Sequence, residues 1–235
     1  MSRKNSPVSI ILPTYCEAKN IVPLVQAIQN SLLNTKKEIL IVDDYSPDNT
    51  AGIARKRFGK DKSIKIYIRK RRGLAGAILF GLKKARGKYV CVMDTDFNHD
   101  PKELPKMMKI LNNADLVVGS RYVKGGGMEN RLRNYLSRIY NRIIKFVLHL
   151  PTCDNLSGFF MAKREKLTYL LNAQIFQGYG DYFIRFLYQA NKQGLKIREI
   201  PVYYKNRIHG VSKSKFTSML SEYSGTVFEL IFKTK

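Results

Sequence analysis

The chain has 235 residues and a mass of 27.1 kDa, which suits one sizeable α/β domain with an appendage and is short for two domains. Its 42 Lys and Arg residues against 18 Asp and Glu give a net charge of +24, so we expect a polyanionic partner such as nucleic acid, nucleotide phosphates or an anionic membrane surface. The three cysteines are far apart and lack a C-x-x-C spacing, which argues against a disulfide framework or a zinc site and fits a reducing, cytosolic environment.

Short β-branched runs alternate with longer helical patterns through the first half of the chain. We expect strands at 8–12, 39–42, 64–68, 89–93 and 116–118, separated by helices at 21–33, 49–58, 74–85 and 102–111. Four strand–helix repeats predict a mostly parallel sheet with flanking helices and right-handed crossovers. Ligands of such sheets bind beyond the carboxyl ends of the strands. The residues to inspect therefore follow the strands, at 13–17, 43–48, 94–99 and 119–122.

The second half of the chain departs from this rhythm from about Gly125. Apolar residues recur at helical spacing in two stripes, the first made of Leu132, Leu136, Ile139, Tyr140, Ile143 and Val147, and the second of Phe216, Met219, Leu220, Tyr223, Val227, Leu230 and Ile231. Arg and Lys residues lie largely outside the first stripe. Each stripe fits a helix that faces the core, and in so basic a chain each also fits a helix lying in a membrane interface.

Between the stripes, residues 178–190 predict a loop that enters a helix, and residues 197–204 predict a further strand. We expect one domain over 1–215, including the helix at about 130–149, and a C-terminal amphipathic helix over 216–235. No secretory signal is visible, and no apolar run approaches the roughly 20 residues that cross a bilayer, so we expect no membrane-spanning segment.

The most informative motif is Asp94-Thr95-Asp96, at the end of the fourth expected strand. Two carboxylates there present oxygen ligands to a hard divalent cation, which in turn binds the diphosphate of a nucleotide. Asn98 is a further oxygen donor at the next alternate position. Acidic turn residues after a strand are also common without any metal, and His99 before Asp100-Pro101 fits a turn residue better than a metal ligand.

A second acidic motif, Asp43-Asp44, follows the second expected strand. A carboxylate at this place accepts hydrogen bonds from a ribose or a nucleobase, and Tyr15 and Glu17 should approach the same place. Helix capping by Ser46 or Asp48, with Asp44 solvated, is the alternative.

Two glycine-containing loops are candidates for phosphate contact. Residues 73–77 open a helix but lack the full spacing of a nucleotide fingerprint, and close packing of helix on sheet explains them as well. The basic loop after the last strand contains Arg207, Gly210, Ser212, Lys213 and Lys215. Such a loop can close over a diphosphate, or it can be an exposed connection.

Together these motifs resemble the family 2 glycosyltransferases, and within them the polyprenyl (dolichyl) phosphate mannosyltransferase group. The matching stretches, in chain order, are Pro13-Thr14-Tyr15-x-Glu17-x-x-Asn20-Ile21, Val42-Asp43-Asp44-x-Ser46-Pro47-Asp48-x-Thr50, Arg72-Gly73-Leu74-x-Gly76-Ala77, Asp94-x-Asp96-x-Asn98-His99, Val118-Gly119-Ser120-Arg121-Tyr122-Val123-x-Gly125-Gly126, Asp154-x-x-Ser157-Gly158-Phe159 and Arg207-x-x-Gly210-x-Ser212-Lys213.

The resemblance implies a GT-A fold, a nucleotide-sugar donor with GDP-mannose as the first choice, Mg²⁺ or Mn²⁺ as cofactor, and a polyprenyl phosphate acceptor. The nucleotide-sugar residues it implies are Pro13, Tyr15, Glu17, Val42, Asp44, Asp94, Thr95, Asp96, Arg207 and Lys213. The implied metal residues are Asp94, Asp96 and Asn98, and the acceptor-phosphate residues are Arg121, Arg133 and Ser137. Asp94, Asp96, Arg121 and Arg207 are the expected catalytic set.

The implied chemistry needs no dedicated base, since the second pKa of a phosphate monoester lies near 6 and the lipid phosphate is mostly dianionic at neutral pH. We expect in-line attack with inversion, with positioning and charge neutralisation supplying the acceleration. The expected location is the cytoplasmic face of a membrane, held peripherally by the interface helices or by a separate membrane partner.

The chain departs from the family pattern at two places. Asn98 stands where many relatives have Gln, and Arg185 lies near the place of a family Glu, with Asp181 as the nearest acid. A UDP-sugar donor such as UDP-glucose stays open, as do two other classes of function. A basic nucleic-acid-binding protein would explain the charge, but no nucleic-acid module is visible and clustered carboxylates repel phosphate. A catalytically silent membrane adaptor would leave Asp94 and Asp96 without a purpose.

Overall fold

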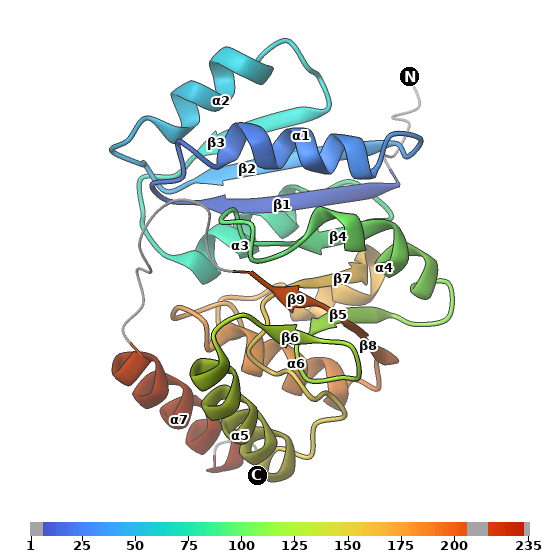
Figure 1. Ribbon diagram of the computed structural model, residues 1–235, viewed down its shortest axis with the longest axis vertical. Helices are drawn as coiled ribbons and strands as arrows, with labels where there is room; N and C mark the ends of the chain where they lie inside the picture. The colour runs from blue at the N-terminus through green and yellow to red at the C-terminus, as the bar shows by residue number, and fades with distance from the viewer. Residues whose placement is uncertain (1–6, 206–215, 233–235) are drawn as a thin grey trace.

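The computed structural model describes residues 7–205 and 216–232, which form a layered α/β fold with a pair of helices at one end (Figure 1). The strands are β1 (Val8–Thr14), β2 (Lys37–Asp43), β3 (Ile64–Ile68), β4 (Tyr89–Val92), β5 (Leu116–Ser120), β6 (Gly127–Met128), β7 (Phe160–Lys163), β8 (Ile197–Pro201) and β9 (Tyr203–Tyr204). The helices are α1 (Ile21–Ser31), α2 (Thr50–Phe58), α3 (Leu74–Lys84), α4 (Leu104–Ile110), α5 (Arg131–Val147), α6 (Tyr182–Lys192) and α7 (Phe216–Phe232), with 3₁₀ segments at Pro101–Glu103 and Arg164–Leu170.

Seven strands form the central sheet in the order β3-β2-β1-β4-β7-β5-β8, and β6 pairs with β9 in a separate small sheet. β1 to β4 are parallel to one another and β5 is parallel to β8, which confirms the predicted mostly parallel sheet. β7 is antiparallel to both of its neighbours, β4 and β5. This strand was not expected, because its four residues belong to no strand–helix repeat and show no alternation. The single strand expected at 197–204 is wrong in one respect: it is divided into β8 and β9 at Val202.

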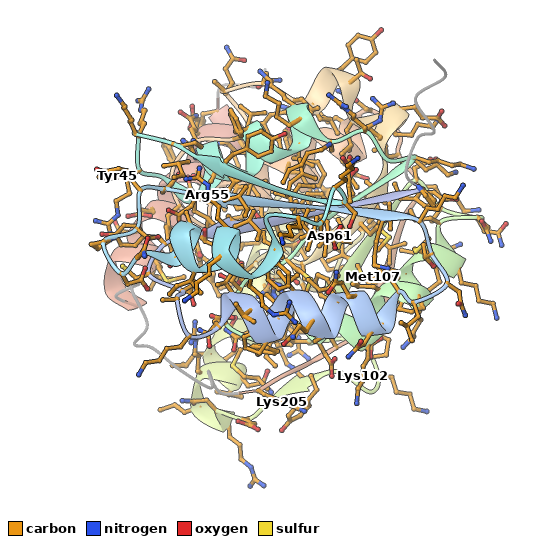
Figure 2. The ribbon with its side chains drawn as sticks, turned by 90° about the horizontal axis from the view of Figure 1, so that it is seen from above. Tyr45, Arg55, Asp61, Lys102, Met107 and Lys205 are labelled. Atoms are coloured by element: carbon orange, nitrogen blue, oxygen red, sulfur yellow. The ribbon has the colours of Figure 1, made fainter. Side chains whose placement is uncertain are left out.

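The two faces of the sheet bury separate apolar clusters. On one face, α1 and α4 contribute Leu24, Ile28 and Met107. Figure 2, seen from above, shows α1 and α2 next to each other on this side of the sheet. On the other face, α3 and α6 contribute Ile78 and Phe186. Because both faces are covered, a strand such as β1 is buried along its whole length and reads as a continuous apolar run rather than an alternating one.

Helices α5 and α7 lie side by side beyond α6, at the end of the molecule away from β3 (Figure 1). Their shared contacts form a third cluster that includes Ile144, Ile184 and Tyr223, and the hydroxyls of Tyr140 and Ser224 are 3.0 Å apart. Within the described residues, no helix has both the length and the apolar content to span a membrane.

The apolar stripe of α5 faces away from the core, so the interpretation of this helix as core-facing is wrong for most of the stripe. Leu132 is 70% exposed, Ile143 50% and the neighbouring Phe146 80%, whereas the buried α5 side chains are Asn141 and Ile144. The stripe of α7 is divided: some of its apolar side chains, such as Tyr223, are buried against α5 and α6, while others are exposed. The exposed apolar residues of α7 are Leu220, Phe228, Ile231 and Phe232.

Candidate active site

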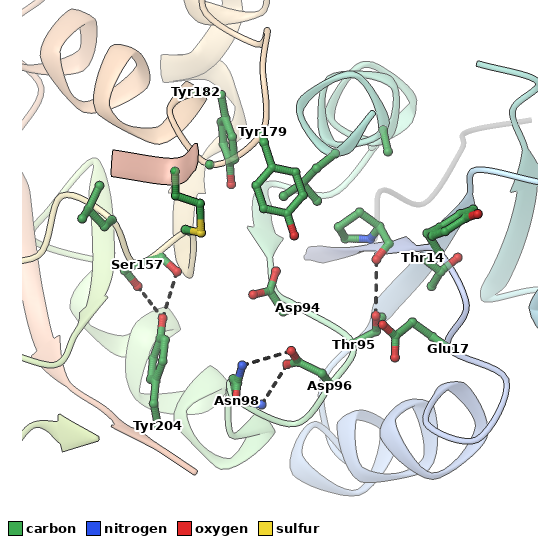
Figure 3. A pocket seen from close by; sticks show the side chains of 18 of the residues that line it. Thr14, Glu17, Asp94, Thr95, Asp96, Asn98, Ser157, Tyr179, Tyr182 and Tyr204 are labelled. Atoms are coloured by element: carbon green, nitrogen blue, oxygen red, sulfur yellow. Dashed lines mark hydrogen bonds between the residues drawn. The ribbon is translucent and has the colours of Figure 1, made fainter. Parts of the chain in front are cut away.

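A pocket of about 600 Å³ opens at the carboxyl edge of the sheet. The turns after β1, β2 and β4 form one side, and side chains from α5, α6 and α7 form the other (Figure 3). The predicted site residues that line it are Pro13, Tyr15, Glu17, Asp44, Asp94, Thr95, Asp96, Asn98, Arg121 and Arg133. Val42 is fully buried in the core, and Ser137 lies one helical turn beyond Arg133 on α5. Arg207, Ser212 and Lys213 lie outside the described residues.

The turns at this edge hold an unusual share of strained backbone. Of the five non-glycine residues with positive φ in the described chain, four follow β1, β2 or β4: Cys16, Tyr45, Asn49 and Phe97. Left-handed conformations cost free energy for residues with a Cβ and tend to persist where a binding site requires them. Tyr45 is 73% exposed and projects outward (Figure 2), so its strain belongs to the shape of the turn rather than to a buried contact.

Asp94 and Asp96 differ in their accessibility. Asp96 is 3% exposed and is held by Asn98, whose backbone N–H donates to Oδ1 at 3.1 Å and whose side-chain Nδ2 donates to Oδ2 at 3.0 Å. Asn98 therefore presents its amide nitrogen, not its oxygen, to this carboxylate. The Asp94 side chain is 42% exposed and points into the pocket (Figure 3).

This donor set fits Mg²⁺ or Mn²⁺. No group of three or more His, Cys, Asp or Glu side chains that would enclose a metal exists in the described part of the chain. Two carboxylates with open space beside them suit an ion that keeps several waters and takes its remaining ligands from substrate phosphates. Asp94 and Asp96 would hold the ion, and Asn98 would orient Asp96.

His99 is a buried part of the site whose role the sequence did not reveal. Its Nδ1 accepts the backbone N–H of Asp94 at 2.8 Å, and its Nε2 lies 2.8 Å from the hydroxyl of Tyr204. Tyr204 in turn donates to the carbonyl of Ser157 at 2.9 Å. Burial lowers the pKa of His99 to about 4, an effect opposed by Asp96, so the ring is neutral at pH 7 and its approach to Asp94 Oδ2 at 3.7 Å is no ion pair. Both ring nitrogens are engaged, so His99 fixes the turn at Asp94 and has no ring nitrogen left for a metal.

Arg121 is 5% exposed and paired with the fully buried Asp154. Its Nε and Nη2 donate to the two Asp154 oxygens at 2.7 Å each, which uses two of the five N–H donors of the guanidinium. Its charged group lies 4.8 Å from the centre of the Tyr204 ring. Although burial opposes it, the Asp154 carboxylate raises the pKa of Arg121 above its ordinary value, so the arginine stays charged at the pocket wall.

Asp44 connects the β2 turn to the loop before α3. Its Oδ2 accepts the N–H of Gly73 at 2.7 Å, and its Oδ1 lies 3.0 Å from Arg69 Nη1. Burial raises the pKa of Asp44, and the Gly73 hydrogen bond and Arg69 oppose that rise. Gly73 thus joins the loop before α3 to the β2 turn, and of residues 73–77 it is Gly73, Leu74 and Ala77 that line the pocket.

The alternative for the acidic motif after β2 is right about Asp48, which bonds the first residue of α2, and wrong about Asp44, which is 6% exposed and not solvated. Asp43 accepts the Thr14 hydroxyl at 2.9 Å and the Ser46 N–H at 2.9 Å, while Asp48 Oδ1 accepts the N–H of Thr50 at 3.1 Å. These side chains stabilise the turn, and Asp44 is left to line the pocket.

Sequence reasoning missed the cations and aromatic residues that complete the pocket. Arg72 lies 3.7 Å from the centre of the Tyr15 ring, and Lys205 also lines the pocket. The tyrosines missed are Tyr179, Tyr182, Tyr204 and Tyr223. Aromatic residues in α6 and α7 resemble ordinary core residues in sequence, and the fold is needed to show which of them reach the pocket.

The sequence and the fold were compared with known proteins. The profile of the family described as glycosyl transferase family 2 matches residues 9–171. A dolichol-phosphate mannosyltransferase of Pyrococcus furiosus is 34% identical over 95% of this chain, which spans 63% of that protein's length. An undecaprenyl-phosphate mannosyltransferase of Micrococcus luteus is 32% identical over 88% of this chain and 86% of its own. A polyprenol monophosphomannose synthase of Mycolicibacterium smegmatis is 33% identical over 87% of this chain and 79% of its own length.

Among solved structures, a glucosyl-3-phosphoglycerate synthase of Mycobacterium tuberculosis, crystallised with Mn²⁺ and UDP, superposes with a TM-score of 0.69. The two proteins are 20% identical, and the match covers 97% of this chain and 79% of the other. At that identity the likeness concerns the fold, which is GT-A as predicted. With the profile match across most of the chain and relatives above 30% identity, the chain belongs to glycosyl transferase family 2.

Proposed function

We propose that this protein transfers mannose from GDP-mannose to a polyprenyl phosphate, with inversion at the anomeric carbon and with Mg²⁺ or Mn²⁺ bound. The observation that carries the proposal is that one pocket is lined by the carboxylates Asp94 and Asp96 and by the arginines Arg121 and Arg133. Carboxylates suit a metal–diphosphate, and arginines suit a second phosphate group. The relatives named for mannosyl transfer to prenyl phosphates support the choice of substrates.

The donor nucleotide would lie against the β1 and β2 turns. Tyr15 and Glu17 line this end, and Asp44 offers a carboxylate for ribose or base. The bound metal would supply charge neutralisation for the departing nucleoside diphosphate. Arg207 and Lys213 remain proposed as the cations that close over the diphosphate.

The acceptor phosphate would lie between Arg121 and Arg133. Arg121 is held rigidly by Asp154, whereas Arg133 is exposed at the first turn of α5, with Ser137 one turn further. A phosphate oxygen placed there would attack the anomeric carbon of the sugar. The new carbon–oxygen bond would form on the side of that carbon opposite the leaving diphosphate. The bond between the carbon and the diphosphate oxygen would break, and its electron pair would leave with the nucleoside diphosphate. The dianionic phosphate needs no proton removed, so the arginines act by holding it in line.

We propose peripheral association with a membrane at its cytoplasmic face, and the exposed apolar surfaces of α5 and α7 support the contact with the membrane. Ile143 and Phe146 are exposed on α5, and Arg131 and Arg142 are exposed on the same helix. A helix with an apolar face flanked by cations suits an interface with anionic lipid. Because Arg133 is on α5 too, the lipid surface and the acceptor site would share one helix.

A product assay tests the proposal. The protein would be incubated with Mg²⁺ or Mn²⁺, a short-chain polyprenyl phosphate and a panel of labelled nucleotide sugars, and the lipid phase would be extracted. Label from GDP-mannose in the lipid phase, lost in Asp96→Ala at saturating metal, is the expected result. Label from UDP-glucose instead would replace the donor, and normal turnover by Asp96→Ala would refute the role of the metal.

A further inference from the structure

Two tyrosines face Asp94 across the pocket, and neither belongs to the metal, nucleotide or acceptor-phosphate groups described above. Tyr182 begins α6 and is 3% exposed, with its ring stacked against Phe176 at 5.6 Å. Tyr179 lies in the preceding turn and is 37% exposed. Figure 3 shows both hydroxyls pointing into the pocket on the side of Asp94.

The Tyr182 hydroxyl is placed to serve a ligand rather than the fold. It is not hydrogen-bonded to any residue that the structure describes, although it lies at a buried wall. Polar groups at buried positions generally have partners, and here the partner is expected from the substrate.

A buried acid fixes the second tyrosine. Asp181 is 5% exposed, and its Oδ1 accepts the backbone N–H of Tyr179 at 2.8 Å. Its Oδ2 lies 2.5 Å from Arg185 Nη1 and accepts the hydroxyl of Thr226 at 3.1 Å. Arg185 also donates to Thr226 at 2.7 Å through Nη2. Asp181, Arg185 and Thr226 therefore clamp the Tyr179 turn to α7.

Building on the proposed function, we infer that Tyr179 and Tyr182 recognise the hexose of the donor, with Asp181 as a positioning residue held by Arg185 and Thr226. The hexose is bonded directly to the diphosphate, so a diphosphate at Asp94 and Asp96 places the sugar next to these carboxylates. Aromatic rings that carry hydroxyl groups offer a hexose both an apolar face and hydrogen bonds. An isoprene chain would leave the Tyr182 hydroxyl without a partner, which makes the sugar the better occupant.

The test separates the sugar from the nucleotide. Affinities for GDP and for GDP-mannose would be measured by calorimetry, without acceptor, for the wild type, Tyr182→Phe and Tyr179→Phe. Tyr182→Phe should weaken GDP-mannose binding about tenfold, as expected for one lost hydrogen bond to a polar ligand, and leave GDP binding within about twofold. Its melting temperature should be unchanged, because the hydroxyl contributes no bond within the described protein. Tyr169→Phe is the matched control, since Tyr169 is 84% exposed and does not line the pocket.

Equal losses for GDP and GDP-mannose, or no loss for either, would overturn the inference. An increase only in the KM for polyprenyl phosphate would assign the tyrosines to the acceptor and overturn it as well. If the wild type prefers a UDP-sugar, the proposed donor is wrong. The role of the tyrosines is then decided by the same comparison, made between UDP and that UDP-sugar.

The clamp is tested with Thr226→Val, which removes one hydroxyl at nearly constant volume. The expected result is a lower ratio of kcat/KM for mannose over glucose donors, with GDP affinity unchanged, and Tyr179→Phe should lower the same ratio. A lower melting temperature with an unchanged sugar ratio would show that Thr226 is structural only and would overturn its part in positioning.

Discussion

Replacing Asp154 by Asn should destabilise the protein strongly, even though Asp154 does not line the pocket. Asp154 is fully buried and Arg121 is 5% exposed, and the two share a pair of 2.7 Å hydrogen bonds. Removing one charge leaves the guanidinium buried without its counter-ion, which in comparable sites costs about 3–5 kcal/mol. Asparagine has nearly the same size and keeps one acceptor oxygen, so we expect Asp154→Asn to lower the free energy of unfolding by about 3 kcal/mol. In a chain of this length that corresponds to a fall of about 6–12 °C in melting temperature.

Urea titration and calorimetry would measure the loss, and a double variant supplies the control. Arg121→Met combined with Asp154→Asn removes both charges and keeps an amide oxygen for the backbone N–H of Arg121, which donates to Asp154 at 2.9 Å. This double variant should regain most of the stability that Asp154→Asn loses, because no buried charge is left without its counter-ion. The same double variant should stay inactive if Arg121 holds the acceptor phosphate. A loss below about 1 kcal/mol for Asp154→Asn would refute the reasoning, since it would mean that water or another acid compensates Arg121.

Three further outcomes are expected. Asn98→Ala should weaken Mn²⁺ binding about tenfold in calorimetric titration by releasing Asp96, and unchanged affinity would show that Asn98 does not orient it. Burial raises the pKa of Glu38, but hydrogen bonds from Lys65, Ser9 and the backbone of Arg86 outweigh burial, so the pKa lies below that of an ordinary glutamate. Glu38→Gln should therefore cost about 1–3 kcal/mol at pH 7. Urea titrations should show this difference shrinking as the pH falls from the pKa of an unfolded glutamate through the lower pKa of the folded state, where the wild-type carboxylate becomes protonated. Phe146→Glu should reduce the fraction of protein that sediments with anionic vesicles without lowering stability. Tyr169→Glu, at a similarly exposed site, should leave that fraction unchanged. Equal reductions for the two variants would argue against a membrane interface on α5.

The sequence predicted the parallel core and the edge that carries the site because both follow from short-range rules. Apolar runs such as Ile64–Ile68 and helical spacing such as Leu74–Lys84 are local signals, and the structure has both elements within a residue of the expected bounds. The carboxyl-edge rule then brought Asp44 and Asp94 to one pocket without knowledge of their side-chain partners.

What the sequence could not supply depends on contacts between distant residues. Asp154 is separated from Arg121 by 33 positions and Tyr204 from His99 by 105, and no local pattern marks either pair. The orientation of α5 is of the same kind. An amphipathic stripe shows that a helix has an apolar face, but the packing of Ile144 and Asn141 decides which face is covered.

The short strand β7 determines how the two halves of the site are aligned. In the described sheet the β1–β4 half and the β5–β8 half are hydrogen-bonded to each other only through β7, and Phe160 pairs with both Val92 and Val118. Asp94 and Arg121 follow those two partners by only two and three positions along their strands. If β7 paired one residue out of register with either neighbour, Asp94 would move relative to Arg121 by about 3.4 Å. Every β7 side chain would then face the opposite side of the sheet. The spacing between Asp94 and Arg121 is thus set by the backbone pairing of four residues, so substitutions in β7 that preserve its apolar character can still change the shape of the pocket by changing that alignment.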